Sequence, residues 1–441
     1  MKKIQQIVIG IWLMLFPVWA NAQHSSAVYI QGNIWSADND SITLTYYSHK
    51  LGDTDITAIK QKVSAKNGFF EFNIPNMSEP FFASIISSHW KNLVLNNLLI
   101  EPGDSIVIRV LDSNYDPALL KAKPFFHIIG RNASKIQFQH NLDWAVRHNK
   151  IQGIKPQIAN SYNDLNEILP DIQQNTKLYT MYWDSLYNQQ AEPISVKATA
   201  AFKLDLQIKK IKALVNAYNS LFEKKLNQSD RATAVPALVE EYQSTVHPQV
   251  EEILRNNVLD ILTPEFLDFA VRKTMADTRY KKGHLDPIPA MDYFHALQQW
   301  PENTREKIMT SLLAYFFVFT PRVKDTYKLL MHVEPMIQHP ELKKLMYKFQ
   351  EAYLQGTTVP DFSLTNTKGE KLSIRDFQDK VVVIDFWFTG CKACITMSRL
   401  LKQIKDKMGE QEDIVFMSIS VDEKKDVWLQ SVAQGIYTHP D

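Results

Sequence analysis

Cysteine and glycine are scarce in this sequence, and neither sign of charge is in excess. Two cysteines among 441 residues exclude a small secreted scaffold that is held together by many disulfides. Thirteen glycines exclude collagen-like and glycine-rich chains. With 49 Lys and Arg against 48 Asp and Glu, the chain lacks the basic excess of nucleic-acid-binding proteins, so we expect no nucleic acid partner. Hydrophobic residues make up 45%, enough for real cores, and the length predicts two to four domains.

Long apolar segments are lacking beyond the N-terminus. Residues 7–20, which follow Lys2 and Lys3, are largely apolar, and Ala20-Asn21-Ala22 places small residues where a signal peptidase reads them. We predict a secretory signal peptide at residues 1–22. A membrane anchor is the alternative, although the stretch is shorter than the ~20 residues that span a bilayer. The short basic start suits a bacterium, so we expect the mature chain in a periplasm, touching a membrane only through an uncleaved signal peptide.

Residues 25–125 have the pattern of a β-rich domain. Residues 42–47 alternate in the way of a half-buried strand. Asn67-Gly68 separates two strand-like runs, and this dipeptide favours tight hairpin turns because it tolerates positive φ. Pro102-Gly103-Asp104 marks another turn. Short strands with regular turns predict a β-sandwich-like fold, and the absence of clustered catalytic residue types favours a packing or docking role.

Residues 130–353 are expected to form a central all-α region. Apolar residues recur at helical spacing around residues 202–214. His247-Pro248 and His339-Pro340 are each expected to open a helix, because the missing N–H of proline is harmless at a first helical position. The apolar run at 312–319 is too short to span a bilayer and predicts a buried helix face.

Residues 354–441 alternate strand and helix patterns, which predicts an α/β domain. The apolar run at 381–384 is typical of a parallel strand that is buried on both faces. Cys391 and Cys394 follow, and a helical stripe runs on to Met408. Gly409 then suits the end of that helix. The two cysteines are therefore placed where a strand turns into a helix.

That position predicts redox chemistry. The first turn of a helix has unpaired N–H groups and a positive dipole end, which lower a thiol pKa from ~8.5 to between ~3.5 and ~7.5. We expect Cys391 to be the exposed, attacking thiolate and Cys394 to resolve the mixed disulfide. Asp385, a carboxylate near the end of the apolar strand, is expected to have a raised pKa and to exchange a proton with Cys394. These three residues are the predicted catalytic site.

Other uses of the cysteine pair have less support. A structural zinc site needs four ligands, and no second cysteine pair or convincing histidine pair is present, so no metal is expected. Haem attachment requires a histidine at position 395, which is Ile395. A purely structural disulfide remains an alternative, although so short a loop constrains little of the unfolded chain.

Residues 359–437 resemble the TlpA and ResA type of exported thioredoxin-like thiol-disulfide oxidoreductases. The resemblance rests on VPDFSL at 359–364, DFW at 385–387, the CxxC pair and IVFMSISVD at 414–422. It implies a thioredoxin-like fold, a protein-disulfide reductase without a cofactor, protein disulfides as substrates and an upstream dithiol donor. One departure is Gly390, where thioredoxins usually carry tryptophan before the first cysteine, so the pair is expected to be less shielded.

A second departure concerns the end of the chain. Family members continue through a cis-proline loop, two strands and a helix, whereas this sequence ends at Asp441. We therefore expect the thioredoxin-like domain to be incomplete, with exposed apolar surface on the strand at 381–384. The alternative function is a binding or docking protein, or a remnant whose thioredoxin-like domain is inactive.

Overall fold

The chain forms two compact units, divided between Leu354 and Gln355. The computed structural model describes residues 26–33, 41–47, 58–87, 94–110, 126–154, 164–190, 192–257, 259–283, 288–319, 323–353, 358–359, 361–409, 411, 413–422 and 424–438. The predicted signal peptide at residues 1–22 lies outside these residues.

The first unit begins with strands that form two four-stranded sheets, ordered β4-β1-β7-β8 and β3-β2-β5-β6. The strands are β1 (Val28–Asn33), β2 (Ser41–Tyr47), β3 (Ile59–Ser64), β4 (Phe69–Ile74), β5 (Phe81–Ser87), β6 (Val94–Ile100), β7 (Ser105–Val110) and β8 (Phe126–Arg131). Neighbours are antiparallel except β1 and β7, which are parallel. Strand β8 lies beyond residue 125, the expected end of the β-rich segment, because its Phe126 and Ile128 complete the shared core.

The two predicted turns connect one sheet to the other. Asn67 and Gly68 both have positive φ, at 51° and 78°. Only Lys66 and Phe69 pair across this turn, because β3 joins one sheet and β4 the other. The turn at 102–104 likewise leads from β6 into β7 of the opposite sheet. Side chains from both sheets meet in one buried hydrophobic cluster.

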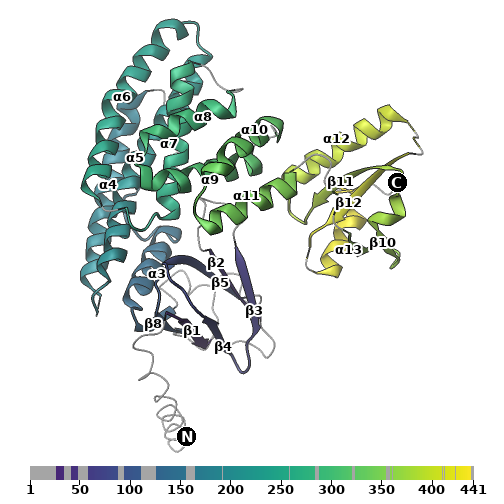
Figure 1. Ribbon diagram of the computed structural model, residues 1–441, viewed down its shortest axis with the longest axis horizontal. Helices are drawn as coiled ribbons and strands as arrows, with labels where there is room; N and C mark the ends of the chain where they lie inside the picture. The colour runs from purple at the N-terminus through teal and green to yellow at the C-terminus, as the bar shows by residue number, and fades with distance from the viewer. Residues whose placement is uncertain are drawn as a thin grey trace, which may run out of the picture. The chain divides into compact units, whose positions relative to one another are not determined.

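Helices follow the strands. They are α3 (Ser134–Arg147), α4 (Leu165–Asn188), α5 (Val196–Leu226), α6 (Arg231–Asn256), α7 (Pro264–Lys282), α8 (Ala290–Ala296), η4 (Leu297–Gln299), α9 (Glu302–Phe319), α10 (Val323–Val333), η5 (Glu334–Met336) and α11 (Pro340–Tyr353). Helix α5 packs against α4, α6 and α7, and Figure 1 shows these long helices side by side. No helix among the described residues has the length and apolarity needed to cross a bilayer.

The sequence-based expectations for this helical part have mixed outcomes. The buried face at 312–319 is confirmed for Leu312, Leu313 and Phe316, which lie in the helical core, whereas Val318 is exposed. Pro340 opens α11 as predicted. The prediction for His247-Pro248 is wrong, because both residues lie inside α6. Proline is compatible with the start of a helix but does not by itself define one.

Buried contacts join the sandwich to the helices. Phe138 of α3 lies in one hydrophobic cluster with Leu99 of β6 and Phe202 of α5. Lys135, only 1% exposed, forms ion pairs with Glu101 (3.0 Å) and Asp104 (2.7 Å). Ser195, the N-cap of α5, donates to the Glu101 carboxylate. These contacts explain why the β-rich and helical segments form one compact unit.

The second unit contains two pairs of strands and the helices α12 and α13. Its elements are β9 (Ser363–Thr365), β10 (Lys371–Ser373), η6 (Ile374–Phe377), β11 (Val381–Trp387), α12 (Lys392–Met408), β12 (Ile414–Ser420) and α13 (Lys425–Gln434). Strands β9 and β10 pair antiparallel, and β11 and β12 pair parallel. Among its described residues, the buried hydrophobic side chains are Trp387 and Tyr437.

The expected burial of β11 on both faces is wrong, whereas the expected exposure of apolar surface on this strand is observed. The strand pairs in parallel, but Val381 is 61% exposed and Val382, Val383 and Ile384 are only half-buried. The apolar stripe of α12 is also open to solvent, with Met397, Leu400, Ile404 and Met408 all exposed. The predicted periodicity is correct, but in the described residues too few neighbouring elements cover these faces.

Candidate redox site

The candidate site forms where β11 leads into α12. The strand ends at Trp387, a turn spans residues 388–390, and Cys391 is the N-cap of the helix. The Cys391 N–H donates to the carbonyl of Phe388 at 3.2 Å, which closes the turn. Gly390 has φ of +94°, a conformation that side chains with a Cβ rarely adopt. The structure therefore places both cysteines at the predicted strand-to-helix junction.

Cys391 and Cys394 form a disulfide, with their Cα atoms 5.3 Å apart. The backbone N–H of Cys394 donates to Sγ of Cys391 at 3.1 Å. This N–H belongs to the first turn of α12, where helix donors lack intrahelical partners. On reduction, the same donor and the positive helix end would stabilise a thiolate on Cys391. Both cysteines are half-buried, so burial class does not separate them as the sequence led us to expect.

Asp385 lies on β11, two residues before Trp387, and is half-buried. Burial raises the pKa of its carboxyl above the ordinary value, in the direction expected from the sequence. The backbone of the same strand approaches the second cysteine, since Sγ of Cys394 lies 4.0 Å from the carbonyl oxygen of Phe386. A carboxyl group with a raised pKa beside this segment suits proton exchange with a thiol.

A hydrogen-bonded group behind the turn was not found by sequence reasoning. The Asp422 carboxylate accepts from the Thr389 N–H (3.1 Å), the Thr389 hydroxyl (2.9 Å) and the Ser420 hydroxyl (2.8 Å). The Thr389 hydroxyl also lies 2.7 Å from that of Ser431 in α13. Burial alone would raise the pKa of Asp422, but these donors outweigh it and lower the pKa below its ordinary value. Asp422 is therefore ionised at neutral pH.

Tyr437 contacts the turn through its hydroxyl group and the end of β11 through its ring. Its hydroxyl accepts a hydrogen bond from the Gly390 N–H at 2.8 Å. Its ring stacks on Trp387, with centroids 5.0 Å apart and planes 4° apart. Tyr437 follows Gly435, which ends α13 in the left-handed conformation. The sequence signal that could have found these residues is slight: a polar pair at the end of the next strand and an aromatic residue after the last helix.

Exposed apolar side chains occur near the cysteines in the sequence and on the neighbouring strand end. Phe386 is 61% exposed, and Phe388 and Val421 are also exposed. The turn before the disulfide therefore carries exposed aromatic surface at Phe388, next to the exposed Lys392 between the two cysteines. Such surface suits contact with a polypeptide substrate, because apolar side chains supply most of the contact area in protein recognition.

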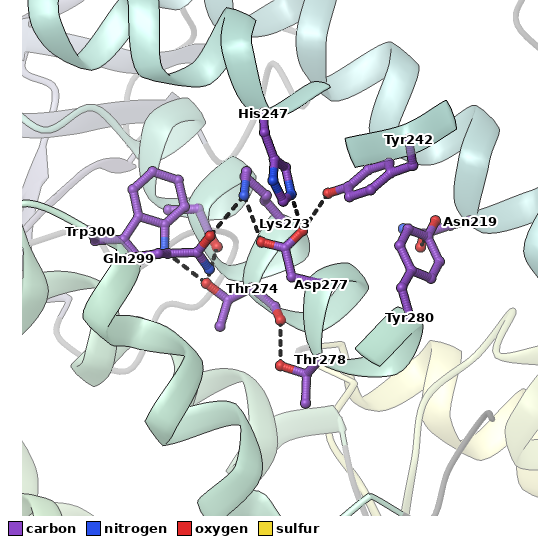
Figure 2. Close-up of polar contacts among 11 residues, drawn as sticks. Asn219, Tyr242, His247, Lys273, Thr274, Asp277, Thr278, Tyr280, Gln299 and Trp300 are labelled. Atoms are coloured by element: carbon purple, nitrogen blue, oxygen red, sulfur yellow. Dashed lines mark hydrogen bonds and ion pairs between the residues drawn. The ribbon is translucent and has the colours of Figure 1, made fainter. Parts of the chain in front are cut away.

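A second polar cluster lies in the helical core of the first unit. Figure 2 shows Tyr242, His247 and Lys273 directed at Asp277. The Asp277 carboxylate accepts from Tyr242 Oη at 2.7 Å and from Lys273 Nζ at 2.6 Å, and His247 Nε2 lies 3.4 Å away. Lys273 Nζ also donates to Gln299. These groups satisfy one another, so we interpret the cluster as a structural link between α6, α7 and η4.

Metal binding has no support in the part of the chain that the structure describes. No three histidine, cysteine, aspartate or glutamate side chains there are placed to hold a metal ion together.

Comparisons with known proteins relate this chain to thioredoxin-like proteins. The family model of SCO1/SenC matches residues 350–433. The thioredoxin-like protein YneN of Bacillus subtilis is 34% identical over 92 residues, which cover 20% of this chain and 52% of that protein. The thiol-disulfide oxidoreductase ResA of Geobacillus kaustophilus is 30% identical over 70 residues, 16% of this chain and 40% of that protein. The chain thus spans about half or less of the curated relatives it matches. No solved structure matches it.

Proposed function

We propose that this chain, whose C-terminal unit is related to the thioredoxin-like proteins of the TlpA and ResA type, is an exported thiol-disulfide oxidoreductase that reduces protein disulfides. The observation that carries the proposal is the cysteine pair at the start of α12, with Cys391 as N-cap and the Cys394 N–H directed at its sulfur. A zinc or haem role would need ligands that this pair lacks.

The proposed reaction begins with the reduced pair. The Cys391 thiolate attacks one sulfur of a substrate disulfide, so that a mixed disulfide forms and one substrate thiolate leaves. Asp385 accepts the proton of the Cys394 thiol. The Cys394 thiolate then attacks Sγ of Cys391, the second substrate thiolate leaves, and the Cys391–Cys394 disulfide forms. Two electrons pass to the substrate, and an upstream dithiol donor restores the pair.

Single-cysteine variants test this scheme in the mature full-length chain. Cys391→Ser is expected to abolish reduction of a model protein disulfide, because no attacking sulfur remains. Cys394→Ser is the matched control, since it keeps the attack but lacks resolution, and it should accumulate a mixed disulfide that non-reducing electrophoresis detects. Full turnover by Cys391→Ser would exclude the scheme. Absence of reduction by the wild-type chain would instead favour the alternative, in which the chain is a binding or docking protein.

Export is the second part of the proposal, and it is supported by the sequence pattern at residues 1–22. The expected mature N-terminus is Gln23. Mass spectrometry of the protein from a periplasmic extract checks this, and a protein that keeps Met1 and stays with the membrane would favour the anchor instead.

A further inference from the structure

The turn that precedes Cys391 is held by residues that come much later in the chain. Thr389 is bonded to Asp422, 33 residues on, and Gly390 to Tyr437, 47 residues on. We infer that Asp422 and Tyr437 are positioning residues that set the reactivity of Cys391 by fixing this turn. The inference rests on the proposed function for its meaning, although its measurement does not require turnover.

Asp422 fixes the first half of the turn, because its carboxylate binds both the backbone and the side chain of Thr389. Its carboxylate accepts from both the backbone N–H and the side-chain hydroxyl of Thr389, at 3.1 and 2.9 Å. The carboxylate is itself oriented, because the Ser420 hydroxyl donates to it and the Asp422 N–H donates back to that hydroxyl. Two bonds to one residue restrict both the position and the rotation of the Thr389 peptide.

Tyr437 fixes the second half of the turn. Its hydroxyl accepts from the Gly390 N–H, and its ring lies flat on Trp387 at the end of β11. Trp387 is 1% exposed and Tyr437 is 5% exposed, so both stacked side chains are buried. Since Trp387 and Gly390 stand at the two ends of the turn, one side chain links both ends.

Cys391 follows directly, so any shift of the turn moves its sulfur. The stabilising contact is specific: the Cys394 N–H reaches Sγ of Cys391 at 3.1 Å. If the turn loosens, the hydrogen bond from the Cys394 N–H to Cys391 Sγ forms less often. The N-terminus of α12 then stabilises the Cys391 thiolate less. Loss of either anchor should therefore raise the thiol pKa of Cys391.

The charge of Asp422 and its hydrogen bonds should shift the thiol pKa of Cys391 in opposite directions. A nearby carboxylate disfavours a thiolate, so removal of its charge alone should lower the thiol pKa. Removal of its positioning bonds should raise it. Asp422→Asn keeps the shape, removes the charge and weakens both bonds from Thr389. A raised pKa in this variant can come only from positioning.

The experiment measures the alkylation rate of Cys391 by iodoacetamide from pH 4 to 10 in the reduced full-length chain, with mass spectrometry to assign the site. For both Asp422→Asn and Tyr437→Phe we expect the midpoint to rise and the rate near pH 6 to fall about threefold to tenfold, the effect of one hydrogen bond. The matched controls are Asp426→Asn and Tyr347→Phe, which alter exposed side chains and should leave the profile unchanged. An unchanged midpoint in the folded variants, or a lowered one in Asp422→Asn, overturns the inference.

A second pair of variants tests the same inference if Asp422→Asn or Tyr437→Phe prevents folding. Thr389→Val removes the hydroxyl that donates to Asp422 but keeps the backbone N–H, and Thr389→Ser keeps both donors. We expect a raised midpoint for valine and a midpoint close to wild type for serine; equal midpoints overturn the inference. If the variants give the expected alkylation midpoints but Cys391→Ser still reduces disulfides, the proposed function fails while the positioning inference stands.

Discussion

Gly390 shows how one backbone conformation shapes the candidate site. Its φ of +94° is rare for any residue with a Cβ, yet a Cβ built there would meet no atom within 4 Å. The constraint therefore comes from the backbone and not from crowding. It explains the departure from the thioredoxin pattern, because a tryptophan at this position would be strained. The turn in this chain depends on glycine, and the nearby aromatic residues Trp387 and Tyr437 stack on each other, with the Tyr437 hydroxyl bound to the Gly390 N–H.

Asp385 is expected to affect both the stability of the second unit and its turnover. Its raised pKa means that the folded chain binds this proton more tightly than the unfolded chain does. The group's stabilising contribution is thus fully present below its ordinary pKa and is lost as pH rises through the raised value. Asp385→Asn should remove this pH dependence without lowering stability at pH 7. Because proton exchange is lost, turnover should fall on the order of 10-fold, with water replacing part of the role.

Two measurements check this expectation in parallel: urea unfolding of the second unit from pH 3 to 8, and disulfide reduction over the same range. Asp361→Asn serves as the control. Asp361 is paired with Arg375 and is distant in sequence from the cysteines. Unchanged turnover in Asp385→Asn would leave Asp385 without a catalytic role.

At the scale of elements, the Asp277 cluster links the consecutive helices α6 and α7 to η4, which follows later in the chain. Lys273 is 3% exposed and its ammonium group lies 2.6 Å from the Asp277 carboxylate. Removal of one partner from a buried pair typically costs about 3 to 5 kcal/mol. Since Gln299 still accepts from Lys273, we expect Asp277→Asn to lower the free energy of unfolding of the first unit by about 3 kcal/mol at pH 7.

The pH dependence of this effect has a defined sign. Burial alone would raise the pKa of Asp277, but His247, Lys273 and Tyr242 outweigh it and lower the pKa. The stabilising contribution is therefore present above the ordinary carboxyl pKa and is lost as pH falls through the lowered one. The difference between wild type and Asp277→Asn should shrink in acid, as urea titrations from pH 2 to 7 can show. Asp184→Asn, at an exposed position of α4, is the control and should show no such difference.

Sequence reasoning succeeded where the determining residues are local. The strand before Cys391 and the helix after it follow from periodicity within about thirty residues. Asp422 and Tyr437 were missed because their role depends on hydrogen bonds across 33 and 47 residues. Pro248 was misjudged for a related reason: packing of α6 against α5 maintains the helix across a residue that favours helix starts. The burial of β11 depends on neighbours that periodicity does not describe.

At the scale of the whole molecule, the two units have separate cores. The first contains large clusters in the sandwich and among the helices, whereas the described core of the second centres on Trp387 and Tyr437. Trp387→Phe should lower the stability of the second unit by about 2 kcal/mol, since the smaller ring leaves a cavity and overlaps less with Tyr437. The same change should leave the unfolding of the first unit unaltered.

The double variant Trp387→Phe with Asp277→Asn checks this independence. Calorimetry of the full-length chain should show two transitions, each lowered by its own substitution, with effects that add to within about 0.5 kcal/mol. A coupling larger than that would mean that the two units unfold as one.

The position of β1 bears on how the chain is made. Although β1 comes first, it lies inside its sheet, between Phe69–Ile74 and Ser105–Val110. During synthesis it emerges long before β7, its parallel partner, and parallel pairing of distant segments is slow. Its place in the sheet is complete only when β7 has folded back beside it, and the ion pair between Lys135 and Asp104 also joins segments that are distant in the sequence. The apolar face of β1 thus stays unpartnered through the longest part of folding, and such transiently exposed surface is where misassembly of a sheet begins.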